Sequence, residues 1–326
     1  MNRAGGLALT VASAFSSFPS PYYHRVAEAS GSRWTTVGLF VAHSAASVTA
    51  IGALTRPRLA RYTSARWLLP ALLLADAAGG LLLVVAPTPG GAGWLLVGRV
   101  VTGAALGVLT AVVTSRLAAR RRGPARATAA IFGGVGCGAV LAGTLAAVGL
   151  PRPAVFGLGA AALLAAAIAA PREAGTVVSS RPARARIAAA PALLAFSANG
   201  VLGLFTSTLP GLVAQRAGGA ELVAGLTAGA VMLSAGLARL VLTRMPVAVP
   251  AVAGALTFGL GLPSGSAGPL LAGGVLLGLA AGLAYDRALL LVRRSGAGLA
   301  PVARAQWWGQ VGLILPVVAY PLVVPP

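Results

Sequence analysis

The stretch "WLLVGRVVTGAALGVLT", Trp94–Thr110, is almost wholly apolar and carries a single charge, at Arg99. About 20 such residues in an α-helix cross the hydrocarbon core of a bilayer. An arginine inside a membrane-spanning helix costs at least about 2.5–3.5 kcal/mol on insertion scales, and such residues usually face a cavity or a partner. The stretch therefore predicts a membrane span that carries a candidate functional group.

The rest of the chain has the same apolar character. Of its 326 residues, 57% are hydrophobic and 9% are charged, and the mean hydropathy is +0.87. A soluble domain has about 25% charged residues, so this composition predicts an all-α integral membrane protein instead. Apolar runs separated by proline, glycine and arginine predict eleven spans. They lie near residues 5–21, 35–55, 67–87, 93–115, 127–149, 153–170, 191–213, 221–242, 246–262, 268–290 and 303–324.

The basic residues indicate an orientation in the membrane. All 25 are arginine, against five acids, and the net charge is +20. Such a charge is also typical of nucleic-acid binders. Here, however, the arginines follow the predicted spans: if the N-terminus is cytoplasmic, 19 of them fall in inner segments and four in outer loops. This asymmetry follows the positive-inside rule, and exclusive arginine use is typical of a high-GC bacterium. We therefore expect a multi-pass protein of the bacterial inner (cytoplasmic) membrane, with its N-terminus in the cytoplasm and no nucleic-acid partner.

An internal repeat indicates two halves. At an offset of 175 residues, Leu95–Gly107 ("LLVGRVVTGAALG") aligns with Leu270–Gly282 ("LLAGGVLLGLAAG"), and seven of the thirteen positions are identical. Parallel repeats are a common layout of transporters. We predict a six-helix N-terminal bundle over 1–170, a cytoplasmic linker over 171–190 and a five-helix C-terminal bundle over 191–326.

The fourth predicted span resembles a motif of the major facilitator superfamily (MFS) of secondary transporters, L-x-x-x-R-x-x-polar-G followed by small residues. The matching residues are Leu95, Arg99, Thr102, Gly103, Ala105 and Gly107. The resemblance implies an MFS-type two-bundle transporter with about eleven transmembrane helices, six and five. It also implies transport by alternating access, through a cavity lined by helices one, four, seven and ten.

The chain departs from the family pattern in three places. The loop "GALTRPRLARYTSARW" keeps the positive charges of the family's loop between helices two and three but lacks its aspartate, so the family's gate is not expected in its usual form. The fifth span, with "GVGCGAVLAG", lacks the proline of family antiporters. No twelfth apolar span precedes Pro326, so we expect a shortened second bundle.

Three ionisable residues are predicted within spans. The resemblance implies that Arg99 faces the cavity, where it binds an anionic group of the substrate or tunes a proton-carrying acid. The alternative is a structural arginine that extends to the interface. Asp76 is either a proton carrier or a structural ion-pair partner of Arg99. His43 is either a proton relay or a partner in a hydrogen bond between helices.

Polar faces on other spans complete the candidate site. Ser13, Ser17 and Ser20 recur on one face of the first span, and hydrogen bonding between helices is the alternative explanation for them. The candidate substrate-binding or coupling residues are Ser13, Ser17, Ser20, His43, Asp76, Arg99, Asn199, Thr206 and Gln310. The candidate gating residues are Arg56, Asp286 and Arg287.

Several chemistries are excluded by residue content. Without lysine the chain has no GxxxxGK[ST] phosphate-binding loop and no Schiff-base lysine, and the sequence shows no GxSxG motif. Its acids and two histidines are too isolated to form a metal site, so we expect no enzyme activity, no cofactor and no metal.

The function expected from this sequence is therefore secondary transport. We expect an MFS transporter that moves a small organic solute, as a proton-driven exporter, and acts as a monomer. Its expected partners are the solute, protons and the lipid bilayer. One alternative is a degenerate MFS-like scaffold or assembly protein without transport. Another is an integral-membrane enzyme, for which no active-site constellation is visible.

Overall fold

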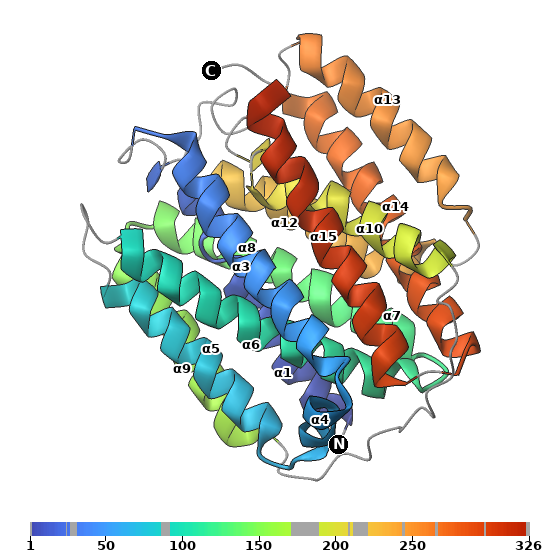
Figure 1. Ribbon diagram of the computed structural model, residues 1–326. Coiled ribbons are helices and arrows are strands. Elements are labelled where there is room, and N and C mark those ends of the chain that lie inside the picture. Colours follow the sequence, from blue (N-terminus) through green and yellow to red (C-terminus); the bar gives the residue numbers. More distant parts are fainter. Residues whose placement is uncertain are drawn as a thin grey trace.

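The computed structural model describes residues 2–23, 25–26, 31–85, 92–170, 189–207, 209–210, 221–242, 245–264, 267–296 and 298–323. These residues form a helical protein without strands (Figure 1). The long helices are α1 (Asn2–Ser16), α3 (Arg33–Leu54), α5 (Leu68–Val85), α6 (Ala92–Ala118), α8 (Gly134–Ala147), α9 (Arg152–Ala169), α10 (Ala189–Ser207), α12 (Glu221–Val241), α13 (Ala248–Ser264), α14 (Ala267–Arg294) and α15 (Leu299–Val323). The short helical elements are η1 (Ser20–Tyr22), α4 (Pro57–Ala60), η2 (Arg61–Ser64), α7 (Gly123–Thr128) and the π-helical turn η3 (Ala129–Gly133).

Each of the eleven predicted spans coincides with a long helix in the described part of the chain, which confirms the all-α membrane fold. In the described residues, seven helical spans are long and apolar enough to cross a bilayer, or eight if the bent segment before α5 is counted with α5. One of the seven is Gly123–Ala147, which consists of α7, η3 and α8 together. The predicted end of the first span is wrong, because α1 ends at Ser16. Pro19 has no N–H for the Phe15 carbonyl, and its ring would clash with that carbonyl in a continued helix.

Glycines at equivalent places in the repeat bring equivalent helices together. A Cβ atom on Gly103 of α6 would meet the backbone carbonyl of His43 on α3. At the equivalent position of α14, a Cβ atom on Gly278 would meet the Val231 carbonyl on α12. Such small residues let helix backbones approach closely. The spacing shared by the two halves therefore produces the same kind of helix pair twice.

Helices from the two halves of the sequence also pack against each other. The α12 helix packs along α8, and α15 packs along α3 and α6. Figure 1 shows α3 and α15 side by side, with α13 at one edge of the molecule and α5 and α9 at the other. Most of the predicted linker, residues 171–188, lies outside the described residues, so the bundle boundaries remain a prediction.

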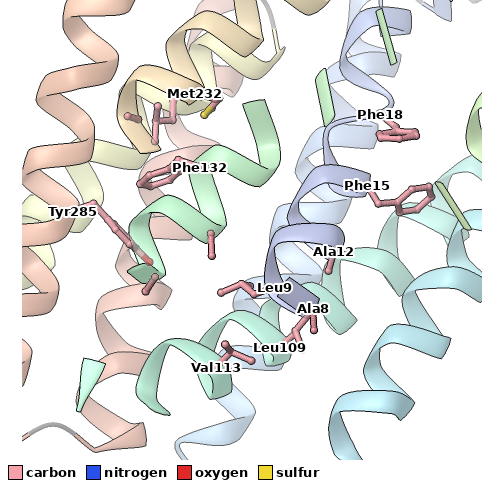
Figure 2. Packing of buried hydrophobic residues seen from close by; sticks show 14 of the residues in the cluster. Ala8, Leu9, Ala12, Phe15, Phe18, Leu109, Val113, Phe132, Met232 and Tyr285 are labelled. Carbon is pink, nitrogen blue, oxygen red and sulfur yellow. The ribbon is translucent and has the colours of Figure 1, made fainter. Parts of the chain in front are cut away.

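The largest hydrophobic core runs through both halves. Figure 2 shows Leu9 on α1 facing Leu109 on α6, both of them fully or almost fully buried. On the other side of the same core, the rings of Phe132 and Tyr285 pack edge to face with centroids 4.9 Å apart. Aromatic pairs prefer this arrangement. The core therefore joins the first bundle to helices α12 and α14.

One end of the bundle carries most of the arginines that the structure describes. Here α3 and α6 end and α5 and α15 begin, and Leu54, Leu68 and Leu299 pack together. We call it the arginine-rich end. Its exposed arginines are Arg56, Arg58, Arg61, Arg66, Arg120, Arg121, Arg122, Arg126, Arg287, Arg294 and Arg304.

Candidate substrate cavity between the two halves

A cavity lies in the middle of the bundle, between helices from both halves of the chain. It is lined by α1, α3, α6, η3 and α8 on one side and by α10, α12, α14 and α15 on the other. The centres of water-sized molecules have about 90 Å³ available to them, and roughly 10–15 Å³ is enough for one water molecule. The cavity therefore has room for several waters or for part of a small solute.

The cavity brings together eight of the nine predicted substrate-binding or coupling residues. They are Ser13, Ser17, Ser20, His43, Arg99, Asn199, Thr206 and Gln310. Asp76, the ninth, does not line it. The cavity also contains Tyr23, Tyr285 and Gln306, of which the two tyrosines carry no sequence pattern that sets them apart from interfacial or core aromatics.

Arg99 is buried, with 4% of its surface exposed. Its Nη1 donates to the backbone carbonyl of Ser16 over 3.2 Å, and its Nη2 donates to the Tyr23 hydroxyl over 3.2 Å. Its Nε finds no hydrogen-bond partner within the protein. Both partners are neutral, so the positive charge is held in place without being neutralised.

Thr102 links Arg99 to His43. The Thr102 hydroxyl donates to the Arg99 carbonyl over 3.2 Å, and it also lies 3.2 Å from Nδ1 of His43. The Thr102 hydroxyl has one proton to donate. When it donates this proton to the Arg99 carbonyl, Nδ1–H of His43 is the donor to the Thr102 oxygen. In this network Nε2 of a neutral imidazole is an acceptor, and His43 is one of the residues that line the cavity.

The predicted ion pair between Asp76 and Arg99 is wrong. Asp76 is 2% exposed, and its Oδ2 has no hydrogen-bond partner. Both residues belong to the described part of the chain, and the ion pairs found there do not join them. Arg99 nevertheless contributes to the electrostatic field at Asp76. The arginine is held by the Ser16 carbonyl and Tyr23 instead, while Asp76 stays within reach of its charge.

Several cavity hydroxyls and amides are also bonded to a carbonyl three or four residues earlier in the chain. The Ser17 hydroxyl lies 2.8 Å from the Ala14 carbonyl and 2.7 Å from the Val135 carbonyl of α8. Asn199 donates to the carbonyl one turn earlier on α10. Ser13 differs, because its buried hydroxyl has no partner. A buried polar group without a partner costs about 1–3 kcal/mol, and a bound solute or water would relieve this cost.

The three candidate gating residues do not meet at one place. Asp286 is buried and forms an ion pair with Arg239 of α12, with Oδ2 and Nε 3.5 Å apart. Arg287 is exposed and donates to the Met245 carbonyl over 3.3 Å. Asp286 and Arg287 therefore have different partners. Arg56 is exposed at the start of α4.

Packed contacts between the two halves lie on both sides of the cavity. Along α15, Val302 packs with Ala118 of α6 and Val292 of α14 on the side of the arginine-rich end. Further along α15, beyond the cavity residue Gln310, Val317 packs with Tyr23, Val37 and Phe40. At that opposite end Arg25 also forms an ion pair with Glu221 at the start of α12. The cavity is therefore bounded along its length by contacts that join the two halves.

Arg99 sets the electrostatics of this cavity. No carboxylate is present among its lining residues, and Arg99 is the one permanently charged group there. The other polar groups are hydroxyls, amides and one imidazole. An uncompensated guanidinium in a site of low dielectric attracts anions more strongly than the same group does in water. Chemically, the site is suited to a small molecule that has a negative group and apolar parts.

Comparisons with known proteins identify the fold. The sequence matches no family model and no curated protein. The structure, however, matches solved transporters, and it has the MFS-type fold that the sequence motifs predicted.

Three of the matching solved structures show the extent of the likeness. The human organic anion transporter MFSD10 (TETRAN) superposes with a TM-score of 0.66 at 18% identity, over 97% of this chain and 92% of that one. A bacterial homologue of the human lysosomal transporter Spinster, inward-facing and unoccupied, gives 0.64 at 12% identity, over 95% and 80% of the two chains. Its inward-facing, occupied form gives 0.66 at 13% identity, over 95% and 79%.

Proposed function

We propose that this chain is an MFS-type secondary transporter that carries a small organic anion through the central cavity by alternating access. The observation that carries the proposal is Arg99, a buried guanidinium that opens onto a cavity without carboxylates between helices of both halves. The similar structures supply further support, since all three are transporters and one is an organic anion transporter. They are transporters rather than enzymes, which agrees with the expectation of no enzyme activity.

In this mechanism Arg99 binds the anionic group of the solute. Its Nε–H is free, and the Ser16 carbonyl and Tyr23 hydroxyl hold the guanidinium plane in position. A hydrogen bond to a charged group contributes about 1.5–3 kcal/mol. Ser13 adds a hydroxyl without a partner. The solute then moves when the halves separate at one end of the cavity while their contacts at the other end stay closed.

We further propose a direction and an energy source for this transport. The arginine-rich end faces the cytoplasm of the inner membrane, as the positive-inside rule favours, and the N-terminus is cytoplasmic. The protein acts as a monomer and exports the solute, and the inward proton gradient drives this export. Asp76 is the coupling group, because it is a buried carboxyl within the field of Arg99 that has no ion-pair partner of its own.

Transport in proteoliposomes tests this function. The purified protein is reconstituted and offered radiolabelled carboxylates together with amide and amine analogues of the same size. Saturable flux of one or more carboxylates, with the analogues excluded, is the expected result. Absence of flux for every carboxylate, together with a stable protein partner recovered from the native membrane, would contradict transport and favour a scaffold.

Replacing Asp76 by asparagine is expected to uncouple transport from the proton gradient. Asparagine has a similar shape but carries no proton between the two sides, so accumulation driven by a pH gradient falls to the equilibrium level. Exchange of labelled for unlabelled solute, which needs no net proton movement, continues. Both activities are measured in the same vesicles, so exchange serves as the control for folding. Accumulation that persists in Asp76→Asn would remove Asp76 from the coupling mechanism.

A further inference from the structure

The connection between α3 and α5 turns sharply at the arginine-rich end. The segment Arg58–Ser64, which covers most of α4 and all of η2, makes an angle of 100° with Leu68–Val84 of α5. Transmembrane helices are tilted by about 20° on average from the bilayer normal. A segment at nearly a right angle to such a helix therefore lies close to the membrane plane. We call residues 56–67 the elbow.

The exposed side chains of the elbow are those found at a membrane surface. Its four arginines, at positions 56, 58, 61 and 66, are all exposed, and the elbow contains no acid. Between them Leu59, Tyr62 and Trp67 are 41%, 46% and 56% exposed. Tryptophan and tyrosine are enriched at membrane–water interfaces, and arginine reaches polar headgroups while its stem covers apolar surface. The elbow therefore presents a cationic and apolar surface together.

The elbow is held firmly by the helices beside it. Arg116 near the end of α6 donates to the Thr63 carbonyl over 2.7 Å, and the Thr63 side chain is buried. The Arg61 guanidinium lies 4.8 Å from the centre of the Tyr62 ring and donates to its hydroxyl over 2.9 Å. Leu54 and Leu68, on either side of the elbow, belong to one core cluster. The charged surface is therefore presented in a fixed position.

The protein supplies little negative charge for these arginines. The acids in the described part of the chain are Asp76, Glu221 and Asp286, and all three are buried. Glu221 forms an ion pair with Arg25 and Asp286 forms one with Arg239, both of them outside the elbow. Among the described residues, no carboxylate is therefore paired with the elbow in the salt bridges found there, and the elbow offers its positive charge to another molecule. An occupant that lies in the membrane plane and also contacts exposed leucine, tyrosine and tryptophan is a phospholipid.

We propose that the elbow is a binding site for the phosphate groups of anionic phospholipids in the leaflet at the arginine-rich end. Arg58, Arg61 and Arg66 bind the headgroups, and Tyr62 and Trp67 lie at the level of the glycerol backbone and upper acyl chains. Bound lipid fixes the depth of the α3–α5 connection in the membrane. This role is independent of what the cavity transports.

Lipid titration tests the site directly. The detergent-solubilised protein is titrated with phosphatidylglycerol or phosphatidylcholine, and bound lipid is counted by native mass spectrometry. The triple variant Arg58→Gln/Arg61→Gln/Arg66→Gln is compared with Arg120→Gln/Arg122→Gln/Arg126→Gln, which removes the same charge from exposed positions at the same end. An arginine near an anionic surface changes affinity by about fivefold, so the elbow variant is expected to lose at least about tenfold in phosphatidylglycerol affinity, and the matched variant much less.

Two results would overturn the proposal: wild-type affinity in the elbow variant, or an equal loss in the matched variant, which would indicate diffuse charge rather than a site. A second measurement needs no variant and therefore does not depend on how the variants fold. A photoactivatable phosphatidylglycerol is crosslinked to the wild-type protein in bilayers, and the labelled peptides are mapped. Labels should concentrate on residues 56–67, and labels confined to other segments would contradict the site.

Discussion

Replacing Arg99 by glutamine is expected to abolish transport of the anionic solute and to weaken its binding by about tenfold to hundredfold, the equivalent of losing one charge-assisted hydrogen bond. Glutamine keeps polarity and donors at the site but removes the one permanent charge that lines the cavity. Binding is measured by isothermal titration calorimetry of the purified protein, and transport is measured as flux in proteoliposomes.

Arg122→Gln is the matched control for this experiment. It makes the same chemical change at an exposed position of the arginine-rich end, away from the cavity, so its binding and flux should equal those of the wild type. The neutral amide analogue of the solute should bind wild type and Arg99→Gln equally weakly. If Arg99→Gln binds and moves the anion as the wild type does, the guanidinium does not recognise the solute.

The second large effect concerns folding. Gly103→Leu is expected to prevent α3 and α6 from packing, because even a Cβ atom at this position meets the backbone carbonyl of His43. Overpacking a close contact usually costs about 1–3 kcal/mol and sometimes more, and here the obstacle is backbone rather than a movable side chain. We expect a thermal midpoint lowered by several degrees or a failure to purify as a monodisperse species, measured by thermal unfolding and size-exclusion chromatography.

Gly93→Ala on the same helix is the control, because an added Cβ there has nothing within 4 Å. It should leave the midpoint unchanged. A Gly103→Leu protein as stable as Gly93→Ala would show that α3 and α6 are further apart than the structure has them.

Much of the fold could be predicted from the sequence because membrane helices must satisfy their backbone hydrogen bonds internally and must be long and apolar. The repeat also places Gly103 and Gly278 at equivalent positions, and both lie at close contacts between helices. Helix ends were harder to predict. The α1 helix ends before Pro19, and the fifth predicted span begins earlier, through α7 and the π-helical turn η3. In an alanine-rich sequence, no residue pattern clearly indicates where a helix ends or where a π-helical turn occurs.

The candidate site was predicted less completely. The family resemblance implied a cavity lined by helices one, four, seven and ten, and Arg99 and the polar faces of α1 and α10 do line one cavity. The α15 helix, the eleventh in the chain, lines it as well. The partners of Arg99 could not be predicted, because Tyr23 reaches it from beyond the end of α1 and Ser16 contributes a backbone carbonyl. Asp76 and Arg99 both lie within predicted spans, but a position along a helix does not fix the direction of a side chain around it.

Thiol labelling of Ser16→Cys tests whether Arg99 lies in an aqueous cavity that opens to each side of the membrane in turn. Ser16 lines the cavity beside Arg99, and the exposed native thiol is first removed as Cys137→Ser. Ser44→Cys is the control, because Ser44 is fully buried and lies outside the cavity. A membrane-impermeant reagent should label Ser16→Cys from either face of the membrane, with protection by the transported anion, and should leave Ser44→Cys unmodified. Labelling of Ser16→Cys from neither face, or from one face alone, would contradict alternating access.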